Sequence, residues 1–307
     1  MPDYLSTRPF GTTGLQVSPL CIGCAPLGDM PDTFAYSVPE EQALKTIRTV
    51  FQSPINFLDT AASYGDGESE RRIGLVLKEM GGLPAGYVLA TKADRDLKTQ
   101  DFSGEQTRRS VERSLKLLGV DQLQFVYLHD PEHIGFEASM APNGPVDALR
   151  RCKDEGLVAH IGVAGGPIDL MIRFVETGLF EAAISHNRYT LLSQEADPFW
   201  DTCIKYNTAS VNAAPYGSGI LAKGAKAYPR YQYGEASAEY IHRTEKIEQV
   251  CQSYNVPLAA AALQFSLRDP RIISTVIGMT KPERIAETVA LAQHEIPESL
   301  WQVVAAI

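Results

Sequence analysis

The chain has 307 residues, of which 21% are charged and 44% hydrophobic, and its net charge is −9. These values fit a globular chain with an extensive core and exclude collagenous or low-complexity architectures. Neither nucleic acid nor an anionic membrane is an expected partner, because both require a positive protein face. No apolar run approaches the ~18 residues of a membrane span, and residues 1–11 lack the apolar core of a signal peptide, so we expect a cytoplasmic protein.

The five cysteines form no disulfide framework. Cys21 and Cys24 make a C-x-x-C pair, a spacing that can bind metal or carry out redox chemistry. However, the pair lies in a predicted strand, where residues three apart face opposite sides, and no second pair exists. We therefore expect buried, reduced thiols, as is usual in the cytosol, and no metal site.

Along the chain, a hairpin-like stretch over residues 8–17 is followed by a pattern of short apolar runs alternating with helical segments. The strands are predicted at residues 20–26, 55–61, 87–93, 123–130, 159–165, 182–187, 209–215 and 273–279. The helices are predicted at residues 39–51, 68–80, 104–118, 145–155, 167–177, 195–206, 238–254 and 281–292. Two helix starts have the sequence of a capping box, Ser103-x-x-Gln106 and Thr280-x-x-Glu283.

Eight strands alternating with eight helices predict a single α/β domain over residues 1–307, a (β/α)₈ TIM barrel with a short N-terminal β-hairpin. A doubly wound open sheet is the alternative, but it normally binds a dinucleotide through G-x-G-x-x-G after its first strand, and that motif is absent. The long irregular stretches 28–38, 131–144 and 217–237 are expected to be loops over the mouth of the barrel.

Polar residues occur where the predicted strands end, and in a barrel these ends carry the reactive groups. Asp59, Lys92 and His129 each end an apolar run, and Tyr64 follows Asp59 by five residues. Taken singly, each has a structural explanation, such as a helix cap, a solvated strand end or a satisfied core histidine. Taken together they favour function, because a lysine at the end of a buried strand needs a partner, and Asp59 on the neighbouring strand can supply it.

A cation beside Tyr64 would favour its phenolate form and lower the pKa of its hydroxyl. With His129 nearby to orient an oxygen, these groups form an acid–base set that can move a proton on or off a carbinol oxygen. Oxidation of that carbon also requires a hydride acceptor, which no side chain provides, so a nicotinamide cofactor is expected.

Three motifs make this chain resemble the aldo-keto reductases over nearly its whole length: NFLDTAASYGDGESERRIG (56–74), ATK (90–92) and YLHD (127–130). The resemblance implies that Asp59, Tyr64, Lys92 and His129 are the catalytic tetrad of that family. It also implies that NAD or NADP is bound in extended form on a barrel without a Rossmann fingerprint.

The resemblance further assigns a cofactor-binding role to three segments, residues 185–192, 211–221 and 276–289. A capped helix N-terminus at Thr280 would suit phosphate, because it presents free N–H groups and a positive dipole end. The implied cofactor-binding residues are His186, Asn187, Pro215, Tyr216, Ser218, Gly219, Gly278, Met279, Thr280, Arg284, Glu287 and Thr288.

Two departures from the family pattern bear on the ligands. Gly162-Val-Ala164-Gly165 stands where most members have Gly-Val-Ser-Asn, so the grip on the nicotinamide carboxamide must come from elsewhere, with His186 or Asn187 as candidates. Asp130 stands where a tryptophan is common, and a hydrogen-bond acceptor there suits a polyhydroxylated substrate. The chain therefore most resembles the sugar-oxidising branch, the L-galactose, L-fucose and D-threo-aldose 1-dehydrogenases.

We therefore expect an NAD(P)-dependent oxidoreductase that oxidises the anomeric C1 hydroxyl of an aldose to the lactone. Asp130, Tyr64 and His129 would contact the substrate. The alternatives are an NADPH-dependent reductase of small aldehydes or sugar aldehydes and, more distantly, a non-catalytic cofactor-sensing accessory subunit. Lys281 and Arg284 could pair with the 2′-phosphate of NADP, but Gly278 and Met279 stand where NADPH-preferring members often have a basic residue, which favours NAD.

Overall fold

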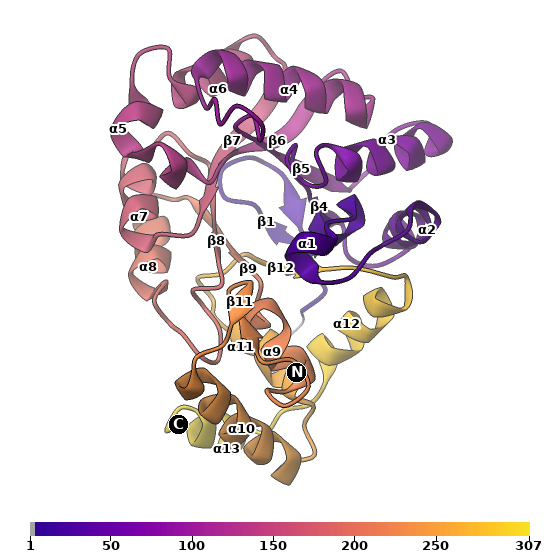
Figure 1. The fold of residues 1–307 in the computed structure, drawn as a ribbon, viewed down its shortest axis with the longest axis vertical. Coiled ribbons are helices and arrows are strands. Elements are labelled where there is room, and N and C mark those ends of the chain that lie inside the picture. Colours follow the sequence, from indigo (N-terminus) through magenta and orange to yellow (C-terminus); the bar gives the residue numbers. More distant parts are fainter. Residues whose placement is uncertain (1–3) are drawn as a thin grey trace.

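The computed structural model describes residues 4–307, and its centre is a closed barrel of eight parallel strands (Figure 1). Neighbouring strands follow chain order around the barrel, and β12 closes it by pairing with both β3 and β9. The predicted barrel is therefore confirmed. The strands are β3 (Leu20–Gly23), β4 (Phe57–Asp59), β5 (Val88–Ala93), β6 (Leu123–His129), β7 (Val158–Gly165), β8 (Ala182–His186), β9 (Ala209–Ala213) and β12 (Ser274–Gly278).

Helices surround the barrel, and all eight predicted helices are present within a few residues of their expected bounds (Figure 1). They are α2 (Glu40–Val50), α3 (Glu68–Met80), α4 (Gly104–Leu118), α6 (Pro145–Asp154), α7 (Ile168–Glu176), α8 (Asp197–Lys205), α10 (Ala238–Ser253) and α12 (Glu283–Gln293). Among residues 4–307, no helix is both long and apolar enough to cross a membrane.

The apolar core has two layers, one inside the barrel and one between the barrel and its helices. The predicted hairpin, β1 (Arg8–Pro9) with β2 (Gln16–Val17), contributes to the inner layer. Phe10 packs edge-on against Phe57 and Phe125 inside the barrel, with both pairs of ring centroids 5.3 Å apart. The hairpin thereby closes the end of the barrel opposite the strand termini that carry the polar residues.

The C-x-x-C pair is divided between these two layers, as the strand geometry predicts. Cys21 faces the inner core and Cys24 the outer one, and both are fully buried free thiols. Burial raises the pKa of both thiols above the ordinary range, so neither is a ready nucleophile or metal ligand.

Two helices that pack in the outer layer are absent from the predicted set, α11 (Leu258–Leu267) and the C-terminal α13 (Glu298–Val304). Helix α11 lies between α10 and β12, and its Ala260, Ala261 and Ala262 are completely buried. A helix that is apolar around most of its surface has no amphipathic period, so the pattern that reveals the other helices does not reveal this one.

The three stretches expected to be irregular contain short regular elements. Residues 28–38 include α1 (Pro31–Phe34), and residues 131–144 include α5 (Gly135–Met140). Residues 217–237 include α9 (Ile220–Lys223) and a small hairpin, β10 (Arg230–Tyr231) with β11 (Gly234–Glu235). These elements are too short for a periodic pattern to reveal them.

Of the two predicted capping boxes, one provides a side-chain cap. The Ser103 hydroxyl accepts a hydrogen bond from the Gln106 backbone N–H at the start of α4. The prediction for Thr280 is wrong, because α12 begins at Glu283 with Pro282 before it and has no side-chain cap. Pro282 already has helical dihedral angles and starts the first turn, which leaves Thr280 too far upstream to cap it.

Candidate active site

A cavity of about 670 Å³ opens at the carboxyl-terminal ends of the barrel strands, a size typical of small-molecule sites. Side chains that end β4, β5, β6 and β8 meet there with the segments that follow β9 and β12. The cavity thus brings together residues that are more than two hundred positions apart in the chain, including Asp59, Tyr64, Lys92, His129, Asp130, His186, Tyr216 and Arg284.

Lys92 and Asp59 form a buried ion pair at the base of this cavity, with exposed fractions of 3% and 4%. The Lys92 ammonium donates to Asp59 Oδ1, to the Thr60 carbonyl oxygen at 2.8 Å and to the Tyr64 hydroxyl oxygen at 3.2 Å. Burial alone would lower the pKa of Lys92, but the attraction of Asp59 and Tyr64 outweighs burial and raises it. Lys92 is therefore a cation with all three N–H groups engaged.

The expectation of a lowered Tyr64 pKa is wrong for the protein without ligands. Burial raises the pKa of Tyr64 above its ordinary value, and Lys92 offsets this only in part. The strand-end pattern predicts the neighbouring cation, but it does not reveal how deeply the hydroxyl is buried. Tyr64 is therefore a neutral phenol at neutral pH, and Lys92 reduces the cost of ionising it.

His129 also lines the cavity and lies edge-on to the Tyr64 ring, with the ring centroids 5.8 Å apart. Its Nδ1 is 2.6 Å from Asp94 Oδ1, and its Nε2 is 3.7 Å from Asp130 Oδ1. Burial alone would lower the pKa of His129, but the two carboxylates raise it. An imidazole in this position can exchange a proton with, or donate to, an oxygen in the cavity.

Eight of the residues implied to bind the cofactor line the cavity. They are His186, Pro215, Tyr216, Ser218, Gly219, Gly278, Thr280 and Arg284. The Arg284 guanidinium makes no hydrogen bond or ion pair within residues 4–307, so it is available to an anionic ligand. A cavity lined by a cation that is free to pair with phosphate fits a dinucleotide.

The other four implied residues do not line the cavity. Met279 and Thr288 are buried, the Met279 side chain within the outer core, and Glu287 is on the surface. Any contact of Met279 with a ligand would have to come from its backbone. Asn187 is buried beside the cavity, where its Nδ2 is 3.2 Å from His186 Nδ1, so it supports His186.

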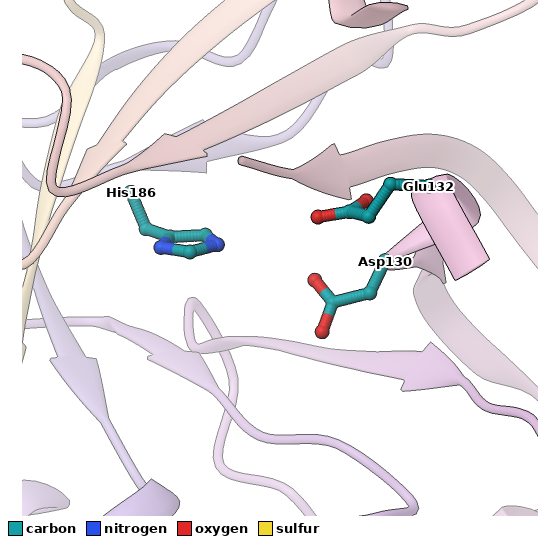
Figure 2. A group of neighbouring side chains, drawn as sticks. All are labelled: Asp130, Glu132 and His186. Carbon is teal, nitrogen blue, oxygen red and sulfur yellow. The ribbon is translucent and has the colours of Figure 1, made fainter. Parts of the chain in front are cut away.

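Asp130, Glu132 and His186 face one another (Figure 2). One ligand atom from each lies within 4.8 Å of the others, a spacing that a divalent cation could use. Asp130 Oδ1 and Glu132 Oε2 are buried and have no hydrogen-bond partner. Burial and Asp130 raise the pKa of Glu132, whereas burial lowers the pKa of His186. These unpaired acceptors also suit a ligand that donates hydrogen bonds.

Two groups of cavity residues were not predicted from the sequence. The first is Asp94, which lines the cavity two positions after Lys92. The second is an aromatic cluster over the mouth. Phe34 stacks on Tyr36 at 5.7 Å and meets Tyr233 edge-on at 6.4 Å, which joins the first and third irregular stretches over the cavity. The loop sequences are aromatic-rich, but only the folded chain brings them together.

Comparison with known proteins agrees with this geometry. The model of the aldo/keto reductase family matches residues 19–307. D-threo-aldose 1-dehydrogenase from a Pseudomonas species is 31% identical, with 96% of each chain covered. Pyridoxal 4-dehydrogenase from Microbacterium luteolum is 28% identical and covers 96% of this chain and 95% of its own.

Among solved structures, the holo form of an aldo-keto reductase from Bacillus halodurans superposes with a TM-score of 0.78. The two chains are 21% identical, and the match covers 98% of this chain and 95% of the other. At that identity the likeness supports the barrel fold. The family match over nearly the whole chain, together with the 31% identical relative, leads to one conclusion: the chain belongs to the aldo/keto reductase family and is an NAD(P)-dependent oxidoreductase.

Proposed function

We propose that this protein oxidises the anomeric C1 hydroxyl of an aldose to the lactone, with NAD(P) as the hydride acceptor. The observation that carries the proposal is the position of Asp130, a carboxylate with a buried unpaired oxygen, beside His129 in the same cavity as Tyr64 and Lys92. A substrate with several hydroxyl groups can donate to such an acceptor while its C1 hydroxyl meets Tyr64. The name of the D-threo-aldose 1-dehydrogenase relative supports the same substrate class.

Tyr64 is the proposed proton acceptor for the C1 hydroxyl. Its hydroxyl oxygen is 3.2 Å from the Lys92 ammonium, which stabilises the phenolate as it forms. Asp59 fixes Lys92 in place, and the burial of the pair strengthens the field of Lys92 at Tyr64. When bound, the nicotinamide supplies the acceptor for the hydride.

His129 is proposed to orient the reacting oxygen, and Asp130 to accept a hydrogen bond from a neighbouring sugar hydroxyl. Burial would raise the pKa of Asp130, but His129 and His186 hold it below the usual range, so Asp130 is a carboxylate. A small aldehyde has no hydroxyl to offer this carboxylate. Asp130 should therefore favour sugars over simple aldehydes.

The cofactor is proposed to extend from His186 to α12, with Arg284 at its phosphates. Two arginines line the described cavity, Arg95 in the loop after β5 and Arg284 in α12. Lys281, near Arg284, is exposed. We favour NAD slightly over NADP, because Gly278 and Met279 offer no cation where the adenosine end is expected. The five free, buried thiols suit the reducing cytoplasm, which is the proposed location.

The test is a panel of aldoses, pyridoxal and small aldehydes, assayed in both directions with each cofactor by absorbance of the reduced nicotinamide. The proposal predicts turnover of at least one aldose with a lactone as the product, and Asp130→Asn should raise KM for that aldose more than for a small aldehyde. Turnover of small aldehydes alone would favour the reductase alternative. Absence of turnover with every aldose would refute the sugar-dehydrogenase proposal.

A further inference from the structure

We propose that Asp94 is a positioning residue that holds the proton of His129 on Nδ1, so that Nε2 is the ring nitrogen that gains and loses a proton toward the ligand. This inference rests on the proposed role of His129 at the reacting oxygen. It concerns the ring nitrogens of His129, whereas the Lys92–Asp59 pair acts on the Tyr64 hydroxyl oxygen. It can be tested without any substrate.

Asp94 is held by hydrogen bonds to both its carboxylate and its backbone. Asp94 directly follows β5 and is 4% exposed, and its Oδ2 accepts from the Ser63 backbone N–H at 2.9 Å. Its own backbone N–H donates to Ser110 Oγ at 3.0 Å. The remaining carboxylate oxygen, Oδ1, therefore meets His129 Nδ1 at 2.6 Å from a rigid support.

The chemistry of the two groups then assigns the tautomer. An ionised carboxylate only accepts hydrogen bonds, so the His129 nitrogen opposite Asp94 has to donate. A neutral imidazole carries one N–H, and the hydrogen bond to Asp94 fixes it at Nδ1. Nε2 is then an acceptor in neutral His129 and a donor in the imidazolium, which lets one atom either receive a proton or hold an oxygen.

The charges around His129 set the pH at which Nε2 gains or loses its proton. Burial opposes the imidazolium, Asp130 and Asp94 favour it, and Lys92 opposes it from the end of β5, with a net rise in the pKa of His129. The other titratable groups that interact with it are His186 on β8, Glu132, Asp59 and the neutral Tyr64. Asp94 is the one of these that also makes a direct hydrogen bond to the ring.

The experiment uses ¹⁵N-labelled protein and reads the nitrogen shifts of His129 against pH, with the resonance assigned by its loss in His129→Gln. We expect the Nδ1–H tautomer in the wild type. In Asp94→Asn the amide oxygen can still accept from Ser63 while its NH₂ faces Nδ1. The variant should therefore adopt the Nε2–H tautomer, and the pKa of His129 should fall by about one unit or more.

Asp66→Asn is the matched control, because it makes the same chemical change at an exposed carboxylate paired with Arg113. It should leave both the tautomer and the pKa of His129 unchanged. In Asp94→Asn the pH profile of kcat/KM should shift in step with the His129 titration, which a purely structural defect would not produce.

Two results would overturn the inference: an Nε2–H tautomer in wild-type protein, or an unchanged tautomer and titration in Asp94→Asn. The wild-type spectrum decides the first even if the variant fails to fold. Both readings are made without substrate, so a failure of the sugar proposal would leave this test intact.

Discussion

Replacing Lys92 with methionine should destabilise the fold much more than replacing Lys92 and Asp59 together. In Lys92→Met the Asp59 carboxylate stays 4% exposed and loses its cation, and the Thr60 carbonyl oxygen loses its donor. Breaking a buried ion pair from one side costs about 3–5 kcal/mol, because a charge is left buried without compensation. The lost hydrogen bond adds about 1 kcal/mol.

The double variant, Asp59→Asn with Lys92→Met, removes both charges and should cost less than Lys92→Met alone, by about 2 kcal/mol or more. Urea unfolding of the wild type, both single variants and the double variant at pH 8 measures the coupling.

In Lys92→Met the cost should also shrink at low pH. Burial raises the pKa of Asp59, and a protonated Asp59 needs no cation. The penalty is therefore complete above the folded-state pKa and is lost as the pH falls toward the unfolded value near ~3.9.

Additive single costs, within about 0.5 kcal/mol, would refute this reasoning, because they would mean that the two side chains do not interact energetically.

Three further predictions address other parts of the molecule. Burial raises the pKa of fully buried Glu70 to about 7 from 4.5, so folding favours its protonated form, and stability is lost as the pH rises from about 4.5 through 7. The free energy of unfolding of Glu70→Gln should therefore rise by about 3 kcal/mol relative to that of the wild type between pH 4.5 and pH 8. Equal urea midpoints for the two proteins at both pH values would contradict this. Gly74→Ala would drive a Cβ from α3 into the Leu117 carbonyl oxygen of α4 and should lower Tm, whereas Gly234→Ala, at an open position, should not. Because the pKa of Tyr64 is raised, kcat should rise with pH for oxidation and fall with pH for reduction, and profiles that are flat or of the same sign would argue against Tyr64 as the proton carrier.

The sequence reveals the barrel and the neighbourhood of its polar strand ends because both follow from simple periodic rules. Parallel strands present their carboxyl ends at one rim, so Asp59 and Lys92 were predictable as partners before any geometry was known. The position of Asp94 was also predictable from its spacing to Lys92. It follows Lys92 by two positions, and alternate residues of a strand face the same side.

The depth of burial of a side chain and the residue at which a helix begins were harder to predict from the sequence. The raised pKa of Tyr64 depends on how deeply its hydroxyl is buried, and burial is a tertiary property. Thr280 has the spacing of a helix cap, yet Pro282 begins the turn instead. The uniformly apolar α11 has no amphipathic period to detect, so packing defines it rather than pattern.

The most direct test of the central claim is kcat for Tyr64→Phe on the best aldose, measured at saturating cofactor. The phenyl ring keeps the packing but cannot take the C1 proton, and positioned acid–base groups contribute about 10²–10⁴-fold. Tyr206→Phe, which makes the same change in the outer core, is the control and should keep wild-type kcat. We predict that Tyr64→Phe loses at least about 10²-fold in kcat with cofactor Kd unchanged. Retention of more than about a tenth of wild-type kcat would contradict Tyr64 as the proton acceptor.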